Sequence, residues 1–224
     1  MTSGIVLSLN VGRAVPNPAK GSGLDTGIGK VPVDHPVTAR RPGPKTTGLH
    51  SGLVGDYIGD VKHHGGDDQA VYAYAAEDYA WWSAELGRDL THGLFGENLT
   101  TEGIDLYNAV MGERWQIGDQ VILEITFGRI PCATFQHKMA EPRWIKRFSA
   151  SNRTGAYLRI LREGEISPGD RIDVIERPGH GLTVSEAFGI YMHTPENLAR
   201  ILVADALPLE MRTDIEKRLA RTAG

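Results

Sequence analysis

The chain contains a single cysteine, Cys132, at the end of the segment Arg129-Ile130-Pro131-Cys132. A cysteine thiolate is a soft ligand that suits molybdenum as well as copper, zinc and iron–sulfur centres. Arg129 would favour the thiolate electrostatically, and Pro131 would stiffen the backbone leading to it. Cys132 is therefore a candidate metal ligand. The alternative is a buried, inert thiol, because free cysteine is among the most buried residue types.

A glycine-rich segment, His63-His64-Gly65-Gly66-x-Asp68, suggests a site for phosphate or another oxyanion. Glycines let the backbone approach a ligand closely and turn N–H groups toward it, and His64 adds a donor or a cation. The alternative interpretation of Gly65 and Gly66 is a tight surface turn with solvated histidines.

A third segment, Phe95-Gly96-Glu97-Asn98-Leu99, carries an amide that can recognise a heterocycle. The Asn98 side chain offers both donors and acceptors, and Glu97 could orient a neighbouring donor. The alternative is an Asx turn, in which Asn98 bonds its own backbone.

Other uses of these residues stay open. A structural zinc site normally takes four ligands, and no second cysteine exists to form a pair. A three-ligand catalytic zinc site could still use His63, His64 and Cys132. Nucleophilic catalysis by Cys132 would need a histidine partner, for which His137 is a candidate. The chain has no Walker A loop, nucleophile elbow or dinucleotide fingerprint.

The cysteine segment follows the clearest strand pattern in the chain. Residues 120–127, QVILEITF, are rich in β-branched and aliphatic side chains and lead directly into the turn at 128–132. A site residue at the end of a strand is held rigidly. Further strands are predicted at residues 4–10, 28–33, 36–39, 156–162 and 171–176, a helix at 77–86, a loop at 52–68, and a loop with short strand character at 94–106.

The last part of the chain has a helical pattern. Thr183 and Glu186 form a capping box, and Thr194-Pro195 is a second helix start. Apolar residues recur every four positions after Pro208. We expect three short helices over residues 183–221, and a division into a domain at 1–180 and a three-helix domain at 181–224. Such a domain would complete the core or dock a partner.

The amino-acid composition limits the classes of protein to which this chain can belong. Hydrophobic residues make up 41%, and 27 glycines with 12 prolines favour short strands joined by turns. The net charge is −4 without a long basic run, which argues against nucleic-acid binding but leaves an anionic cofactor possible. A lone cysteine excludes an internal disulfide. With no signal-peptide pattern and no apolar span, we expect a soluble, cytoplasmic protein and no membrane partner.

Several short motifs, in this order and spacing, resemble the MOSC domain family and its YiiM-like bacterial branch. They cover most of the chain. The motifs are Gly27-Ile28-x-Lys30-x-Pro32-Val33, Gly55-Asp56, His64-Gly65-Gly66-x-Asp68-x-Ala70-Val71-Tyr72, Phe95-Gly96-Glu97-Asn98-Leu99-Thr100, Ile117-Gly118-Asp119, Arg129-x-Pro131-Cys132 and Gly155-x-Tyr157-x-Arg159.

This resemblance implies a mainly β fold with some α: a MOSC β-barrel-like domain followed by a small C-terminal three-helix domain. It implies that the barrel holds the molybdenum cofactor, molybdopterin, and that Cys132 binds the molybdenum. The matching residues would form the cofactor site: Lys30, His64, Gly65 and Gly66 near the pterin and its phosphate, Asn98 near the ring or an oxo ligand, and Arg129 and Pro131 beside the cysteine.

The same resemblance implies a reductase of N-hydroxylated compounds such as hydroxylaminopurines, amidoximes and hydroxylamines. Electrons would come from a separate flavin or iron–sulfur protein, because the chain has no cysteine set for a cluster and no evident flavin motif. Two alternatives stay open: a non-catalytic carrier of cofactor or sulfur, and a degenerate scaffold that binds no cofactor.

The sequence departs from the family pattern at three places. Gln69 stands where a lysine is usual, and the run Gly55-Asp56-Tyr57-Ile58-Gly59-Asp60 lacks the usual glutamine. Residues 16–26 form a longer stretch than the pattern predicts. No role for these features follows from the residues alone.

Overall fold

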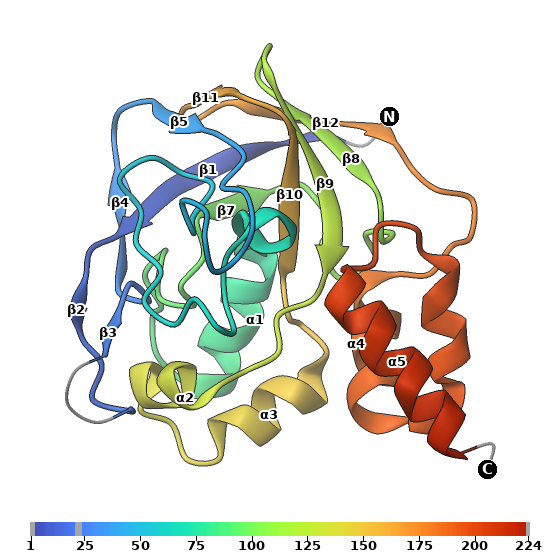
Figure 1. Cartoon of the computed structure of the whole chain (residues 1–224). Helices are drawn as coiled ribbons and strands as arrows, with labels where there is room; N and C mark the ends of the chain where they lie inside the picture. Colours follow the sequence, from blue (N-terminus) through green and yellow to red (C-terminus); the bar gives the residue numbers. More distant parts are fainter. Residues whose placement is uncertain (1–2, 21–23, 223–224) are drawn as a thin grey trace.

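A closed β-barrel forms the centre of the computed structural model, which describes residues 3–20 and 24–222 (Figure 1). Seven strands of the described chain make the ring in the order β12-β8-β9-β10-β6-β7-β1, and β1 closes it by pairing with β12. The ring strands are β1 (Ser3–Gly12), β6 (Val71–Ala75), β7 (Leu99–Glu102), β8 (Arg114–Ile117), β9 (Val121–Phe127), β10 (Ala156–Arg162) and β12 (Arg171–Glu176). The mainly β fold with helices, expected from the sequence, is confirmed.

Shorter strands extend the barrel at its rim. β4 (Lys30–Val33) adds to β1, while β5 (Val37–Ala39) pairs with β11 (Gly164–Ile166). β2 (Val15–Pro16) and β3 (Asp25–Thr26) form a small hairpin of their own. Within the ring, β6 and β7 are parallel and the other neighbouring strands are antiparallel.

The barrel interior is packed with aliphatic side chains that the strands direct inward. Along β10 every second side chain is buried, as the alternation in AYLRILR predicts. β9 is buried on nearly its whole length. α4 packs against its end, where Phe127 contacts Tyr191, and Arg114 and Arg159 bind Glu124 in its middle. The strands predicted at 120–127, 156–162 and 171–176 are therefore confirmed to within one residue.

A second core, made of aromatic rings, lies below the barrel between three helices (Figure 1). These are α1 (Ala76–Leu86), α2 (Ala133–Met139) and α3 (Trp144–Ser151). Its buried rings are Tyr72, Tyr74, Tyr79, Trp82, Phe95, Phe135, Trp144 and Phe148. Trp82 Nε1 donates to Tyr74 Oη at 2.9 Å, whereas the buried Nε1 of Trp144 has no hydrogen-bond partner among the described residues. This core fixes the floor under Cys132.

The C-terminal elements pack against the side of the barrel. They are α4 (Val184–His193), η2 (Pro195–Val203) and α5 (Leu209–Thr222). Thr183 caps α4 by accepting from the N–H of Glu186 at 3.1 Å, as the capping box predicts. The middle element is a 3-10 helix rather than an α-helix. These elements and the barrel share one hydrophobic cluster, so the boundary at residue 180 stays a prediction.

Several elements were not expected from the sequence. The helices α2 and α3, the strands β6 and β8, and the 3-10 turn η1 (Asp67–Gln69) were missed, whereas β7 lies in the loop at 94–106, for which short strand character was expected. Helix α1, by contrast, begins one residue before its predicted start and ends where expected. Among the described residues, no helix combines the length and apolar character needed to cross a membrane.

Candidate functional site

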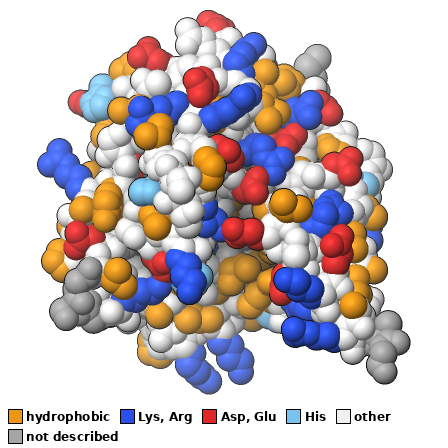
Figure 2. All heavy atoms as spheres, in the orientation of Figure 1, with side chains coloured by type: hydrophobic (Ala, Val, Ile, Leu, Met, Phe, Trp, Pro, Cys, Tyr) orange, Lys and Arg blue, Asp and Glu red, His pale blue; other side chains and the backbone are white. Residues whose placement is uncertain are grey.

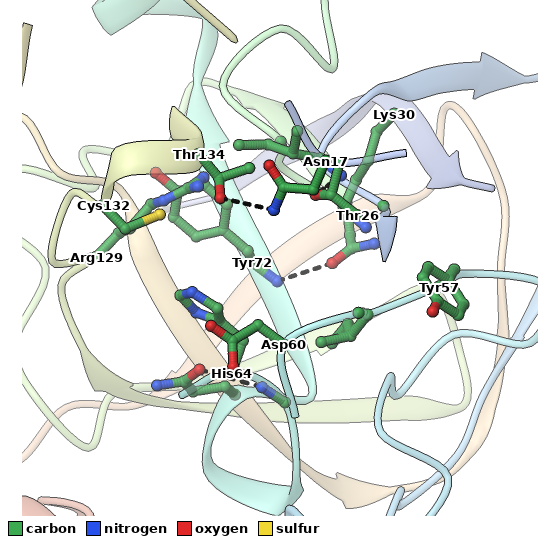
Figure 3. A pocket seen from close by; sticks show the side chains of 18 of the residues that line it. Asn17, Thr26, Lys30, Tyr57, Asp60, His64, Tyr72, Arg129, Cys132 and Thr134 are labelled. Atoms are coloured by element: carbon green, nitrogen blue, oxygen red, sulfur yellow. Dashed lines mark hydrogen bonds between the residues drawn. The ribbon is translucent and has the colours of Figure 1, made fainter. Parts of the chain in front are cut away.

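A pocket and a groove meet at Cys132, where the barrel adjoins α2 (Figure 3). The pocket is about 90 Å³ and the groove about 750 Å³. Both are lined by Asp60, His64, Gly65, Gln69, Cys132 and Tyr157. The groove runs toward the start of α5, and the surface is hollowed between the barrel and the C-terminal helices (Figure 2).

Cys132 lies at this junction as the N-terminal capping residue of α2. Its backbone is extended and its carbonyl accepts the first helical bond, from Gln136 N at 3.0 Å. Burial opposes ionisation of the thiol, but hydrogen bonds from His64 and from the N–H of Phe135, together with the charge of Arg129, lower its pKa to about 6. At neutral pH the side chain is therefore mostly a thiolate. The inert buried thiol considered from the sequence does not fit this exposure and charge.

Arg129 is a buried cation next to the thiol. Its guanidinium lies 4.3 Å from the centre of the Phe135 ring and 5.0 Å from that of Tyr72, and Nη1 donates to the carbonyl of Phe95. Within the described chain no carboxylate lies within ion-pair distance of it, and its Nε has no hydrogen-bond partner. A buried cation with an open donor beside a cavity favours an anionic ligand there.

Lys30 and Asn98 both reach the pocket but are held by one buried carboxylate, Asp56. Lys30 Nζ lies 2.5 Å from Asp56 Oδ1, and Asn98 Nδ2 donates to Asp56 Oδ2 at 3.0 Å. Gly12 N and Ser51 Oγ also donate to this carboxylate. Asp56 thus neutralises Lys30 and fixes the rim of the pocket.

Asn98 makes long-range bonds instead of an Asx turn. Its Oδ1 accepts from the N–H of Tyr72 at 3.2 Å, and its Nδ2 also donates to the carbonyl of Asn10. The neighbouring Glu97 is fully buried, which raises its pKa, and its Oε1 accepts from Tyr79, Gly93 and Thr100. Both side chains hold strands and loops together, and the predicted contact of Asn98 with a cofactor stays a prediction.

The glycine loop places His64 next to the thiol of Cys132. The N–H groups of Gly65 and Gly66 are hydrogen-bonded to other residues of the protein. Gly65 N donates to Gln69 Oε1 at 3.2 Å and Gly66 N donates to the carbonyl of His50 at 2.9 Å. Gln69, the departure from the family pattern, thus closes the loop. Gly65 lines the pocket, whereas Gly66 and Pro131 line only the groove. Their predicted contacts with a phosphate stay predictions.

The other interpretations of the cysteine find less support. Among residues 3–20 and 24–222, no three His, Cys, Asp or Glu side chains are grouped as metal ligands, which argues against the zinc site. His137 lines a separate hollow, and the histidine beside Cys132 is His64. The predicted partner of a nucleophilic cysteine was therefore wrong.

Sequence reasoning missed several residues of the site. Tyr72 and Tyr157 line the pocket next to Arg129. Asn17, from the unassigned stretch 16–26, is 4% exposed, and its Nδ2 donates to Thr134 Oγ1 at 3.0 Å over the cavity. Residues 21–23 of that stretch lie outside the described part of the chain. A polar side chain that becomes buried in a Gly- and Pro-rich segment gives no local sequence signal.

Comparisons with known proteins identify relatives of the chain. The model of the MOSC domain matches residues 60–173. The uncharacterized protein YflK of Bacillus subtilis is 32% identical over 96% of this chain and 95% of its own length. A protein of Gibberella moniliformis named a reductase is 29% identical over 98% of this chain, which spans only 38% of that protein. The crystal structure of YiiM from Geobacillus stearothermophilus superposes with a TM-score of 0.77 at 28% identity, covering 96% of this chain and 99% of that one.

Proposed function

The chain belongs to the MOSC domain family, whose domains are associated with the molybdenum cofactor, and we propose that it is a cofactor-dependent reductase of N-hydroxylated compounds. One observation carries this proposal. The thiolate of Cys132 lies at the junction of two cavities, beside the buried Arg129, which has no carboxylate partner in the described chain. A relative named a reductase agrees with an oxidoreductase.

The residues present fit the cofactor. Cys132 supplies a soft sulfur ligand for the metal, and Arg129, with its unpartnered Nε, supplies a fixed positive charge for the anionic part of the group. When bound, the molybdenum cofactor provides a metal that exchanges two electrons and takes up an oxygen atom. Lys30 and Asn98, organised by Asp56, border the same pocket.

The overall reaction consumes two electrons and two protons. The N–O bond of R–NH–OH breaks, the nitrogen keeps its substituent and becomes R–NH₂, and the oxygen leaves as water. The His64 imidazole donates a hydrogen bond to the sulfur and is therefore the proton-carrying side chain next to it. Ile130, Pro131, Leu209 and Met211 give the groove an apolar lining that accepts an apolar or heteroaromatic substituent.

The substitution Cys132→Ser tests the proposal, because a serine hydroxyl is a far poorer soft ligand at neutral pH. We expect molybdenum content per chain and dye-driven reduction of benzamidoxime both to fall by at least about tenfold, while the circular dichroism spectrum is unchanged. Wild-type turnover in the serine variant would refute metal ligation by Cys132.

The carrier alternative gives a different result in the same samples. A carrier would retain cofactor, show no turnover of any N-hydroxylated compound, and pass its cofactor to an apo-acceptor enzyme. Mass spectrometry of the released cofactor, together with metal stoichiometry, would show whether any cofactor is bound and in which form.

A further inference from the structure

The helical hairpin formed by α2 and α3 carries a concentration of positive charge in an acidic protein. Residues 133–151 contain four Lys or Arg and one Glu, a net charge of +3, whereas the whole chain has −4 and the remaining residues therefore −7. Lys and Arg side chains project from the lower edge in Figure 2, where Figure 1 has α2 and α3. We call the outer side of this hairpin the basic face.

Three cations of the basic face are not neutralised by the protein. In the part of the chain that the structure describes, no carboxylate lies within 4 Å of Lys138, Arg143 or Lys146, and Arg143 and Lys146 are exposed. Glu141, the one acidic residue of the hairpin, is already bound by Arg147 at 3.6 Å and by Arg88 at 3.4 Å. The face thus has charge available for an external partner.

The basic face also has an apolar centre. A shallow hollow lies between α2 and α3, and most of its lining residues are small or apolar: Ala19, Ala133, Ala140, Pro142 and Ile145, together with the polar Gln136, His137 and Glu141. An apolar centre surrounded by charged residues is the usual anatomy of a protein–protein contact.

The position of the face connects it to the site. Cys132 is the N-terminal cap of α2, and Lys138 follows six residues later on the same helix, roughly 9 Å along the axis at 1.5 Å per residue. A partner seated on the hairpin would therefore sit close to the metal ligand without blocking the groove, which opens toward α5.

We infer that the basic face is the docking surface for an acidic iron–sulfur protein that delivers electrons to the site. The inference rests on the proposed function, because a two-electron reduction in a chain with one cysteine needs an external donor. Two reduced one-electron carriers are oxidised for each R–NH–OH that takes up two electrons and two protons to give R–NH₂ and water. Complementary charge steers such short-lived encounters.

The test uses cofactor-loaded protein and a plant-type [2Fe–2S] ferredoxin as the probe. Binding is measured by calorimetric titration at low salt, and turnover of benzamidoxime is measured with either reduced ferredoxin or a reduced dye. The test variant is Arg143→Glu/Lys146→Glu. The matched control is Lys217→Glu/Arg221→Glu, which makes the same change in net charge on exposed residues of α5.

We expect the Kd for ferredoxin to rise about tenfold or more in the test variant and less than about twofold in the control, with the difference shrinking at high salt. Ferredoxin-driven turnover should fall in parallel, while dye-driven turnover stays within about twofold of wild type. Equal ferredoxin binding by the two double variants, or no binding to wild type, overturns the docking face. If binding responds as expected but dye-driven turnover is absent from wild type, the docking face stands and the proposed reductase fails.

Discussion

Cys132 owes its reactivity to its neighbours, because burial alone would keep a thiol protonated. Burial raises its pKa, while His64, Arg129 and the N–H of Phe135 together lower it to about 6. The side chain is therefore ready to bind a metal without first losing a proton at neutral pH.

A first prediction concerns the pH dependence of this thiol in cofactor-free protein. Alkylation by iodoacetamide should rise with a midpoint near pH 6, and His64→Ala should move that midpoint upward because it removes the hydrogen bond to the sulfur. The rate is measured by mass spectrometry from pH 4 to 10. The same midpoint in both proteins would contradict a role for His64 in holding the thiolate.

The same shift makes a prediction about stability. A thiol whose pKa is lower in the folded than in the unfolded protein stabilises the fold when it is ionised. This stabilisation is complete above the unfolded pKa of about 8.5 and decreases as the pH falls to about 6. The difference in free energy of unfolding between wild type and Cys132→Ser should thus grow in favour of wild type from pH 6 to pH 9. Urea titrations at three pH values measure it, and a difference independent of pH would count against the shift.

At the scale of elements, the loop that carries His64 is fixed by a backbone conformation that favours glycine. Gly65 has φ +84°, and a Cβ there would lie 2.6 Å from the carbonyl oxygen of His50. This close approach holds the loop against residues 43–50 and directs His64 at the thiol.

Gly65→Ala should therefore lower the free energy of unfolding by about 2–3 kcal/mol, since it combines positive φ with a backbone clash. Gly179→Ala is the matched control, because an added Cβ there meets nothing within 4 Å and the change should be nearly neutral. Urea unfolding measures both variants. Equal stability of the two would show that the loop relaxes without cost.

The elements that were predictable are those whose pattern is local. Three strands follow from alternating or continuous apolar runs, and the start of α4 follows from its capping box. Helices α2 and α3 are only seven and eight residues long, and neither is capped by a side-chain hydrogen bond. They are held by long-range packing of Phe135, Trp144 and Phe148 in the aromatic core, which no short window of sequence reveals.

The site was predictable only in part for the same reason. The cysteine could be found because it is unique and follows a strong strand. The role of Asp56, in contrast, depends on its four hydrogen-bond donors, which lie up to 44 residues away in the sequence: Gly12, Lys30, Ser51 and Asn98. Whether Lys30 and Asn98 also contact a cofactor is a separate question from this structural role.

At the scale of the whole molecule, the C-terminal elements and the barrel are joined by polar as well as apolar contacts. Arg159 of β10 donates to Glu124 on β9 at 2.9 Å and to the carbonyl of Ala206, before α5, at 3.2 Å. Lys45 Nζ lies 2.5 Å from Glu210 Oε2 at the rim of the groove. These contacts tie the α5 end of the groove to the barrel and to the loop that carries Lys45.

We expect a single calorimetric unfolding transition for the chain. Phe188→Ala, which removes a fully buried ring from the shared cluster, should shift that whole transition and cost about 3–5 kcal/mol, whereas Val203→Ala at a 43% exposed position should have little effect. Two separate transitions, with only one shifted by Phe188→Ala, would instead support independent domains at 1–180 and 181–224.

The closure of the ring by β1 has a consequence for how the protein is made. Ser3, Gly4 and Ile5 of β1 pair with Asp173, Ile172 and Arg171 of β12, so β1 is synthesised well before the strand that closes the barrel onto it. Until residue 173 has been synthesised, the edge of β1 that pairs with β12 stays unpaired. An unpaired strand edge can form hydrogen bonds with strands of other chains. Newly made protein should therefore depend on chaperones that bind extended segments, and the barrel should close only after β12 has been synthesised.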